Sequence, residues 1–282
     1  MAVGVFDSGV GGLTIHRALT GALPQADFVY YSDQAHMPYG PRGGAQIVQL
    51  TQSACARLFA EGCELIVLAC NTASAVALRQ LQHLWLPGLR ARRDRPANIL
   101  GIIVPTIEAV TGKPWHGPHP VSVPSGPQRT VAVFATQATA RSAVYQIEIA
   151  KRRSDLRVVT EPCTGLAGLI EQGAPVAQLR AVIAAHVGAV VSRSGGPPDR
   201  VLLGCTHYEV CAGLFRELLP ASTELIRQPA AIADSLKRYL ARHPEYQAGQ
   251  SGLRRFLTSG RPGIQHEGVE TFWGEPLSFE AA

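Results

Sequence analysis

The sequence lacks the features of secreted, disulfide-stapled or membrane-spanning proteins. Its six cysteines form no C-x-x-C pair, and a chain of 282 residues can build a core without disulfides. The longest apolar run, 181–191, contains His186 and is too short to span a bilayer. The apolar start has no basic leader and is interrupted by Asp7, unlike a signal peptide. We expect a soluble, cytoplasmic protein with free thiols.

Lysine is scarce as well, which limits cofactor chemistry. Lys113, Lys151 and Lys237 are the lysines, and none lies in a segment suited to a Schiff base with pyridoxal phosphate. The glycine-rich segment DSGVGGLT (7–14) has neither the G-x-G-x-x-G order nor the Gly-Lys-Ser/Thr ending of a phosphate loop. We therefore expect no cofactor.

Metal ligands do not form a usable pattern either. Cys205 and His207 are too close together in a strand-to-helix turn to supply half of a usual zinc set. His116 and His119 lie in a segment rich in proline and glycine, without cysteine neighbours. We therefore expect no metal site.

Basic residues outnumber acidic ones, but they are scattered. The net charge is +5 and the pI is about 9.0. Basic residues cluster only at 89–95 and 151–153, and no aromatic-rich basic stripe accompanies them. We do not expect nucleic acid as the main partner; the positive charge instead favours attraction of small anionic substrates.

Short apolar runs alternate with helix-like stretches along the chain, which predicts an α/β fold with parallel sheets flanked by helices. Helices are expected, for example, at 42–61 and 141–153. The expected strands are 3–6, 27–31, 65–69, 98–104, 130–135, 156–160, 200–204 and 224–227.

The chain also contains two copies of one plan. Segments 4–19 and 131–146 each have the pattern of a strand, a polar turn and a helix, and 64–78 matches 199–214 in the same way. This repeat predicts two similar three-layer α/β/α domains related by a pseudo-twofold axis. If the domains face each other, the cysteine of each second segment points into one interdomain cleft.

Two segments interrupt the repeat. The stretch 86–97 indicates a domain boundary, and the proline- and glycine-rich stretch 111–127 is typical of a long surface loop. We expect the strand at 224–227 and the chain after it to return to the first domain. The predicted domains are 1–98 plus 228–282 and 99–227.

Polar residues follow the expected strands at their carboxyl ends, where open α/β sheets bind ligands. Their hydrogen-bond donors, together with the positive ends of the following helices, favour a small anionic substrate. The residues at these ends are Asp7, Ser8, Cys70, Asn71, Thr72, Thr136, Thr139, Cys205, Thr206 and His207.

Cys70 and Cys205 are the candidate catalytic groups. A helix start stabilises a thiolate, so we expect a thiol pKa of about 8.5 to fall toward neutrality. One such cysteine would suggest a nucleophile, but two on opposite walls suggest proton transfer to and from two faces of one carbon, as a racemase needs. The other cysteines, which we expect to be packing residues, are Cys55, Cys63, Cys163 and Cys211.

Three further residues each have two interpretations. Asp7 follows a strand, where it could relay a proton or merely cap the next helix. His207 could donate to Cys205 or to the substrate, or could be a satisfied interior histidine. Glu171 could pair with His207 or with a substrate amine, or could be an exposed helix-end residue.

These residues resemble the glutamate racemase family. The shared motifs occur in family order, cover nearly the whole chain and are highly specific in combination. They are FDSGVGG (6–12), YYSDQAHMPYG (30–40), ACNTASA (69–75), the run Thr136-x-x-Thr139-x-x-Ser142-x-x-Tyr145, LIEQG (169–173), GCTHY (204–208) and LTSG (257–260).

The resemblance implies a cofactor-independent, two-base isomerase that interconverts L- and D-glutamate and supplies the D-isomer for peptidoglycan, and hence for cell wall biogenesis and cell shape. It implies that Cys70, assisted by Asp7, handles the α-proton of D-glutamate. Cys205, assisted by His207 and Glu171, would handle that of L-glutamate. It also implies a homodimer. The implied substrate contacts are Ser8, Pro38, Tyr39, Gly40, Asn71, Thr72, Thr139 and Thr206, to which we add Thr136 from its place at a strand end.

The sequence departs from the family pattern beside the second cysteine, where Glu209 and Val210 replace the usual proline. Three alternatives remain open. The protein could be an aspartate racemase or another two-cysteine relative, or a binding protein that inhibits a DNA-handling enzyme. It could also be a redox protein in which Cys70 and Cys205 form a reversible disulfide.

Overall fold

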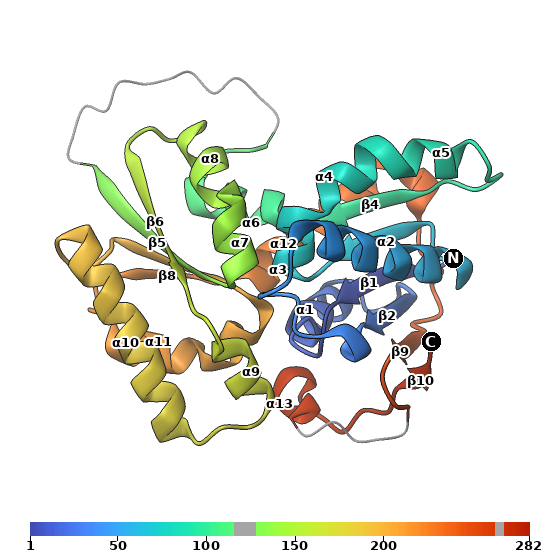
Figure 1. Cartoon of the computed structure of the whole chain (residues 1–282). Coiled ribbons are helices and arrows are strands. Elements are labelled where there is room, and N and C mark those ends of the chain that lie inside the picture. The colour runs from blue at the N-terminus through green and yellow to red at the C-terminus, as the bar shows by residue number, and fades with distance from the viewer. Residues whose placement is uncertain (116–127, 263–267) are drawn as a thin grey trace.

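The computed structural model describes residues 1–115, 128–262 and 268–282 and contains two parallel β-sheets with helices on their faces (Figure 1). The first sheet has the order β10-β9-β2-β1-β3-β4 and the second β6-β5-β7-β8. The strands are β1 (Val3–Asp7), β2 (Phe28–Ser32), β3 (Leu65–Leu68), β4 (Asn98–Gly101), β5 (Arg129–Ala135), β6 (Leu156–Pro162), β7 (Arg200–Gly204), β8 (Glu224–Ile226), β9 (Arg254–Thr258) and β10 (Glu280–Ala281).

The helices connect these strands and cover the sheets. They are α1 (Leu13–Ala22), α2 (Gly44–Ala60), α3 (Asn71–Val76), α4 (Leu78–Gln80), α5 (Leu86–Arg90), α6 (Ile103–Thr111), α7 (Gln137–Ser142), α8 (Val144–Ala150), α9 (Leu166–Glu171), α10 (Val176–Ser194), α11 (Ala212–Leu218), α12 (Gln228–Arg242) and α13 (Val269–Trp273). Short 3-10 turns occupy Gln34–His36, Thr206–Cys211 and Pro244–Tyr246, and a π-helical turn spans Leu81–Trp85.

The predicted repeat is confirmed by the strand order. The first sheet contains the order β2-β1-β3-β4. The second sheet has the order β6-β5-β7-β8, in which each strand comes four strands later in the chain than its counterpart in the first. Every one of these pairings is parallel. The strands that precede the two cysteines, β3 and β7, are therefore equivalent. The first sheet is larger because β9 and β10 extend it beyond β2.

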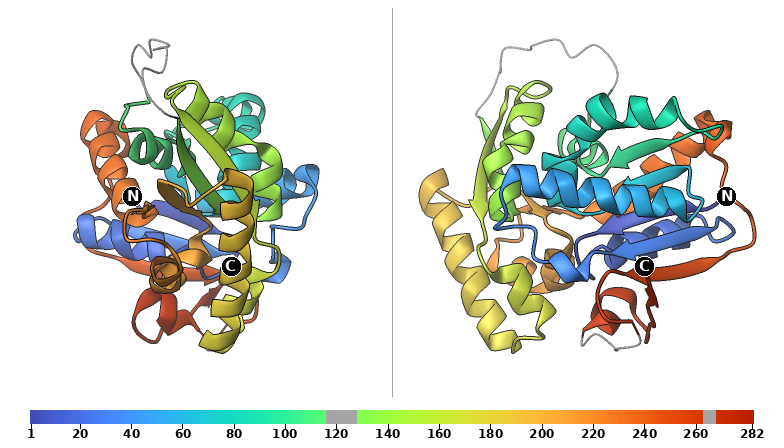
Figure 2. Two further views of the ribbon diagram at one scale, coloured as in Figure 1. Left: turned by 90° about the vertical axis from the view of Figure 1, so that its left-hand side faces the viewer. Right: turned by 45° about the vertical axis from the view of Figure 1, so that its right-hand side comes forward.

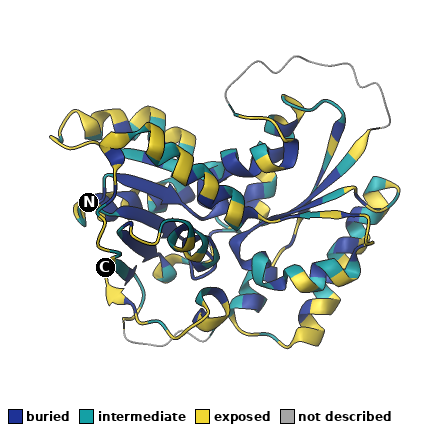
Figure 3. Ribbon diagram, turned by 180° about the vertical axis from the view of Figure 1, so that it is seen from behind, coloured by how far each residue is buried: buried dark blue, intermediate teal, exposed yellow. Residues whose placement is uncertain are grey.

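Each sheet is the middle layer of three. Along β3, Leu65 and Val67 join one hydrophobic core, whereas Ile66 and Leu68 join another on the opposite face, as the two-residue period of a strand requires. The first core continues into the second sheet, so apolar packing joins the two halves. In Figure 3 the strands of both sheets are mostly buried, whereas the outer sides of the helices are exposed. Figure 2 shows α10 on the side of the second sheet that faces away from the first.

The chain crosses between the two halves twice, at equivalent places. It leaves the first sheet after β4 through α6 and returns after β8 through α12, and these two helices pack against each other. The prediction that 224–227 returns to the first domain is wrong, because Ile226 of β8 pairs with Leu202 of β7 in the second sheet. The return begins only with α12.

Several local predictions also needed correction. The strand predicted at 98–104 ends at Gly101 and pairs with β3. The helix predicted at 141–153 is two helices separated by Ala143, whose φ is 54°. Strands β9 and β10 were not predicted. The division into 1–98 plus 228–282 and 99–227 remains a prediction.

Part of the predicted surface loop at 111–127 and the pair His116 and His119 lie outside the described residues. Of the helices that the structure describes, none has the length and apolar character needed to cross a membrane.

Candidate active site

The carboxyl ends of the central strands of both sheets meet at one small cavity of about 40 Å³. Cys70 follows β3 and Cys205 follows β7, and both side chains are buried in its wall. All the other predicted site residues line this cavity too, except Asp7 and Thr139, which lie directly behind lining residues. The arrangement follows from the repeat, because equivalent strand ends of the two halves face each other.

On the first wall, Cys70 caps α3 and its sulfur accepts a hydrogen bond from the backbone N–H of Ala73 at 3.5 Å. The Ser8 hydroxyl lies 3.5 Å from the same sulfur. The predicted fall in the pKa of Cys70 is nevertheless wrong. Burial away from water, reinforced by the charge of Asp7, raises this pKa to about 12 and outweighs the contacts with Ser8 and Ala73. Cys70 is therefore a thiol at neutral pH.

Asp7 does not cap the following helix, since α1 begins after Gly12 without a side-chain cap. Its carboxylate is fully buried, accepts a hydrogen bond from the backbone N–H of Gly9 at 2.9 Å and accepts another from the Thr206 hydroxyl at 3.2 Å. Burial raises the pKa of Asp7 to about 6, against the opposing effects of His207, Gly9 and Thr206. Asp7 is thus a carboxyl group that titrates just below neutral pH.

On the second wall, Cys205 lies beside an ion pair. The Nδ1 atom of His207 is 3.9 Å from the Cys205 sulfur, and its Nε2 atom is 3.1 Å from a carboxylate oxygen of Glu171. Burial alone would lower the pKa of His207, but the contacts with Cys205 and Glu171 raise it well above its usual value. His207 is therefore charged at neutral pH, and Glu171 is engaged with it rather than being an exposed helix end.

The glycine-rich segment after β1 lets these side chains approach. A Cβ atom on Gly11 would lie 2.4 Å from Nδ1 of His207 and 2.6 Å from the Thr206 hydroxyl. A Cβ atom on Gly12 would lie 2.5 Å from the Asp7 side chain. The glycines of DSGVGG thus allow close packing of the two halves and do not form a phosphate loop.

Threonine hydroxyls form a cluster across the cavity. The Thr72 hydroxyl lies 2.9 Å from that of Thr136 and 3.3 Å from that of Thr139. Thr136 also caps α7, where it accepts from the backbone N–H of Thr139. These groups come from both halves and can reorient to donate to a carboxylate.

A loop from the first half closes the cavity. Pro38, Tyr39 and Gly40 line it, the Tyr39 hydroxyl donates to Asp33 at 2.6 Å, and the Gly40 carbonyl accepts from the backbone N–H of Ala138 at 2.9 Å. This last contact holds the loop against the second half.

Sequence reasoning missed several residues of the site. Gly9, Met37, Ala167 and Gly168 also line the cavity, and the first and second of these lie inside motifs that were recognised. Gln228 is buried beneath the cavity and bonds to Asn71. No local pattern marks Gln228, which reaches the site only because the chain returns there after β8.

The four cysteines predicted to be packing residues are buried in the hydrophobic cores or beside them. Burial raises the pKa of Cys63 to about 12 and that of Cys211 to about 11. All six cysteines are free. The described residues contain no group of three or more histidine, cysteine or acidic side chains that could hold a metal ion.

The predicted basic clusters are largely occupied in internal contacts. Lys151 and Arg152 both pair with Glu148, and Arg153 pairs with Asp155. In the other cluster, Arg90 donates to the Ala97 carbonyl. Ion pairs therefore compensate most of the charge of 151–153, whereas 89–95 keeps four arginines against one aspartate.

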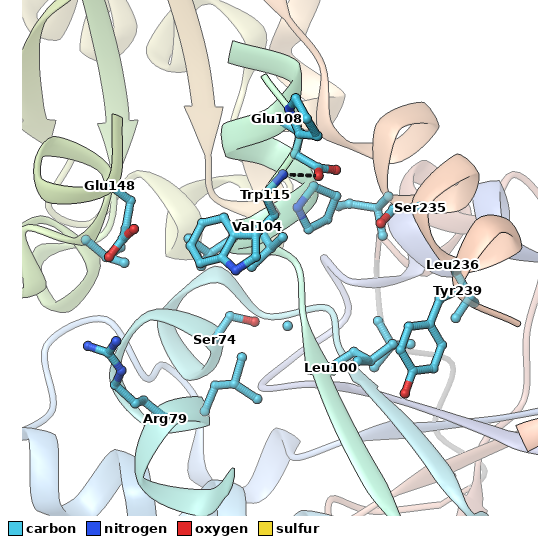
Figure 4. Close-up of a pocket in the computed structure, with 18 of the residues that line it drawn as sticks. Ser74, Arg79, Leu100, Val104, Glu108, Trp115, Glu148, Ser235, Leu236 and Tyr239 are labelled. Atoms are coloured by element: carbon cyan, nitrogen blue, oxygen red, sulfur yellow. Dashed lines mark hydrogen bonds between the residues drawn. The ribbon is translucent and has the colours of Figure 1, made fainter. Parts of the chain in front are cut away.

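A second and larger cavity, of about 1210 Å³, lies between α3, α6, α8 and α12 (Figure 4). Its lining includes Trp115, whose backbone N–H donates to Glu108, but neither Cys70 nor Cys205. Size alone therefore does not identify the active site.

Comparison with known proteins agrees with this geometry. The sequence profile of the family described as Asp/Glu/Hydantoin racemase matches residues 13–235. Glutamate racemases of Phenylobacterium zucineum (strain HLK1) and Caulobacter sp. (strain K31) are 60% and 57% identical over 283 residues, with 100% of both chains covered. The crystal structure of glutamate racemase from Francisella tularensis subsp. tularensis SCHU S4 in complex with D-glutamate superposes with a TM-score of 0.77 at 25% identity, covering 99% of this chain and 95% of that one. The chain therefore belongs to the Asp/Glu/Hydantoin racemase family, among its glutamate racemases.

Proposed function

We propose that the protein interconverts L- and D-glutamate by a two-base mechanism in which Cys70 and Cys205 act on opposite faces of the α-carbon. The observation that carries the proposal is that the two cysteines follow equivalent strands of the two halves and line one cavity. Racemisation requires a base on one side of the carbon and an acid on the other. A repeated fold with one thiol from each half supplies both.

The charges of the site favour one resting form. Positively charged His207 stabilises negative charge on the Cys205 sulfur, whereas Cys70 holds its proton. In this form the Cys205 thiolate removes the α-proton of L-glutamate, and the Cys70 thiol donates its proton to the opposite face. The D-isomer then leaves with Cys70 as thiolate and Cys205 as thiol, and the reverse reaction starts from that state.

The remaining residues stabilise the carbanion and hold the substrate. Negative charge that develops at the α-carbon spreads onto the α-carboxylate, where each well-placed donor stabilises it by roughly 3 kcal/mol. The hydroxyls of Ser8, Thr72, Thr136 and Thr139 are the donors that we assign, whereas the Thr206 hydroxyl donates to Asp7. Because a cavity of about 40 Å³ holds only a few water molecules, it has to widen before glutamate enters.

The direct test is inversion of L-glutamate by the purified protein, followed by circular dichroism without added pyridoxal phosphate. We expect activity in the parent and its loss in both Cys70→Ser and Cys205→Ser. A matched control is Cys55→Ser, at a buried cysteine that does not line the cavity. Full activity in either of the first two variants would refute the two-base mechanism.

A substrate panel separates glutamate from aspartate. The close relatives named glutamate racemase support glutamate, and we expect its kcat/KM to exceed that of aspartate. Equal or greater turnover of aspartate would overturn this assignment.

We propose further that the reaction supplies D-glutamate for peptidoglycan in the cytoplasm. Six free cysteines fit a reducing compartment. Rescue of a D-glutamate auxotroph by the expressed gene would test this role. The homodimer remains a prediction, for which analytical ultracentrifugation is the measurement.

A further inference from the structure

Gln228 lies where the chain returns to the first half. It is the first residue of α12, directly after the chain leaves β8. Its side chain is buried, and its amide contacts three residues from different elements. These partners are Asn71 of α3, Thr106 of α6 and Tyr145 of α8.

The contact with Asn71 is a reciprocal amide pair. Asn71 Nδ2 donates to Gln228 Oε1 at 2.9 Å, and Gln228 Nε2 donates to Asn71 Oδ1 at 3.0 Å. The Tyr145 hydroxyl donates a second bond to the same Asn71 oxygen at 2.7 Å. Both ends of the Asn71 amide are therefore engaged, and Gln228 sets its orientation.

The contact with Thr106 joins the two connections between the halves. Thr106 is in α6, through which the chain leaves the first sheet, and its hydroxyl accepts from Gln228 Nε2 at 2.8 Å. Since Asn71 directly follows Cys70, one buried amide ties the helix start that carries Cys70 to both interdomain connections. Among the described residues, Cys205 makes no hydrogen bond to this network and affects Tyr145 only through its charge; its own wall is held by Glu171 through His207 and by Asp7 through Thr206.

We infer that Gln228 is a positioning residue for Cys70, which holds that sulfur in register with the α-carbon and leaves the Cys205 half-reaction largely unaffected. The inference rests on the proposed two-base function. It assigns Asn71 to the interdomain network through its side chain, so the amide is not free to bind the substrate carboxylate. Displacement of a catalytic group by about 1 Å lowers turnover by up to about a hundredfold, so loss of this network should reduce catalysis beyond any loss of folded protein.

Isotope effects distinguish the two half-reactions. L- and D-glutamate are mirror images, so kcat/KM stays equal in both directions in every variant and cannot reveal which step has slowed. Deuterium at the α-carbon can reveal the slowed step, because Cys70 removes it from D-glutamate and Cys205 removes it from L-glutamate. If the Cys70 step slows, the isotope effect on kcat/KM rises for α-deuterated D-glutamate and falls for the L-isomer. A lower fraction of folded enzyme changes neither ratio.

The test uses Gln228→Met, which keeps the side-chain length and removes the hydrogen bonds, and Thr106→Val, which removes one bond of the network from the opposite side. Ile232→Val is the matched control, because Ile232 has an apolar side chain that is buried in the core one turn further along α12. We expect kcat to fall about tenfold to a hundredfold in Gln228→Met. In both network variants, the isotope effect should rise for α-deuterated D-glutamate and fall for the L-isomer. In the control, neither kcat nor the two isotope effects should change. Parallel changes for the two isomers, or none, would overturn the inference.

Alkylation of the two thiols gives a second measurement that does not depend on turnover. Iodoacetamide labelling at pH 8, followed by mass spectrometry of the peptides, compares Cys70 with Cys205 in each protein. We expect faster labelling of Cys70 in Gln228→Met, because a loosened wall admits water and favours the thiolate, and an unchanged rate at Cys205. If the parent does not invert glutamate, the proposed function fails, and the labelling still decides the inference: equal acceleration at both thiols, or none, refutes it.

Discussion

Thr206 donates a hydrogen bond to Asp7 at 3.2 Å although the two residues are 199 positions apart in the chain. Thr206 directly follows Cys205 of the second half, whereas Asp7 ends β1 of the first half and raises the pKa of Cys70. A single side-chain contact therefore couples the two walls of the cavity. It also holds the Asp7 carboxyl group, whose pKa is raised by burial, against the second wall.

Replacing Thr206 with valine tests this coupling. The hydroxyl lowers the pKa of Asp7, so Thr206→Val should raise that pKa above its value of about 6. The acid limb of the profile of kcat/KM against pH then moves to higher pH. Thr206→Ser keeps the hydroxyl and should keep the limb in place. If the acid limb lies at the same pH in the two variants, this contact does not control the pKa of Asp7.

Asp7→Asn should separate activity from stability. The pKa of Asp7 is 3.8 in the unfolded chain and about 6 in the folded one, so the folded state binds more protons between these values and becomes less stable as the pH rises through them. Above pH 6 the buried charge destabilises the fold by roughly 3 kcal/mol. Asparagine removes this pH-dependent loss, while loss of the proton relay should lower kcat/KM about a hundredfold.

Urea denaturation at pH 4 and pH 7.5 measures the stability of Asp7→Asn, with circular dichroism assays in parallel. Between pH 4 and pH 7.5 we expect the unfolding free energy of Asp7→Asn to rise by roughly 2 kcal/mol relative to that of the parent. A variant that is both inactive and markedly less stable at pH 7.5 would contradict the idea that Asp7 is retained for catalysis at the expense of stability.

Gly11→Ala should displace the side chains of His207 and Thr206 on the second wall and thereby lower activity. The added Cβ atom would meet His207 Nδ1 and the Thr206 hydroxyl at distances that no real contact tolerates, so both side chains must move. We expect kcat/KM to fall by about a hundredfold. Gly188→Ala is the matched control, because that glycine lies within α10 with open space around it, and alanine should stabilise the helix there. Comparable activity of the two variants would refute the packing argument.

What the sequence predicted well depends on local periodicity. The strands around Cys70 and Cys205 are apolar runs that end in polar residues, and the matching of two such segments was enough to predict the shared cavity. The raised pKa of Cys70 was not predictable, because it depends on burial that only tertiary packing creates. Gln228 and β9 were missed for a similar reason. Each acts through partners far away in the chain, such as Asn71 and β2, and neither has a local signature.

His16 should make the protein acid-labile. Its ring is fully buried among Phe28, Tyr30, Phe256 and Trp273, and it stacks on the last at 5.3 Å. Neither ring nitrogen has a hydrogen-bond partner among the described residues, and burial lowers the pKa of His16 to about 3 from 6.5. The unfolded chain therefore binds a proton below pH 6.5 that the folded chain does not, so stability is retained above pH 6.5 and lost at about 1.4 kcal/mol per pH unit below it.

His16→Phe should remove this loss, because phenylalanine fills the aromatic cluster without a titrating group. Relative to the parent, we expect the variant to gain about 2 kcal/mol of unfolding free energy at pH 5 compared with pH 8, measured by urea denaturation at both values. The control His83→Phe makes the same substitution at an exposed histidine, and a comparable gain at pH 5 in this control would refute the assignment to His16. If the His16→Phe difference does not change with pH, the ring gains a proton in the folded state or finds a partner there, and His16 does not cause acid lability.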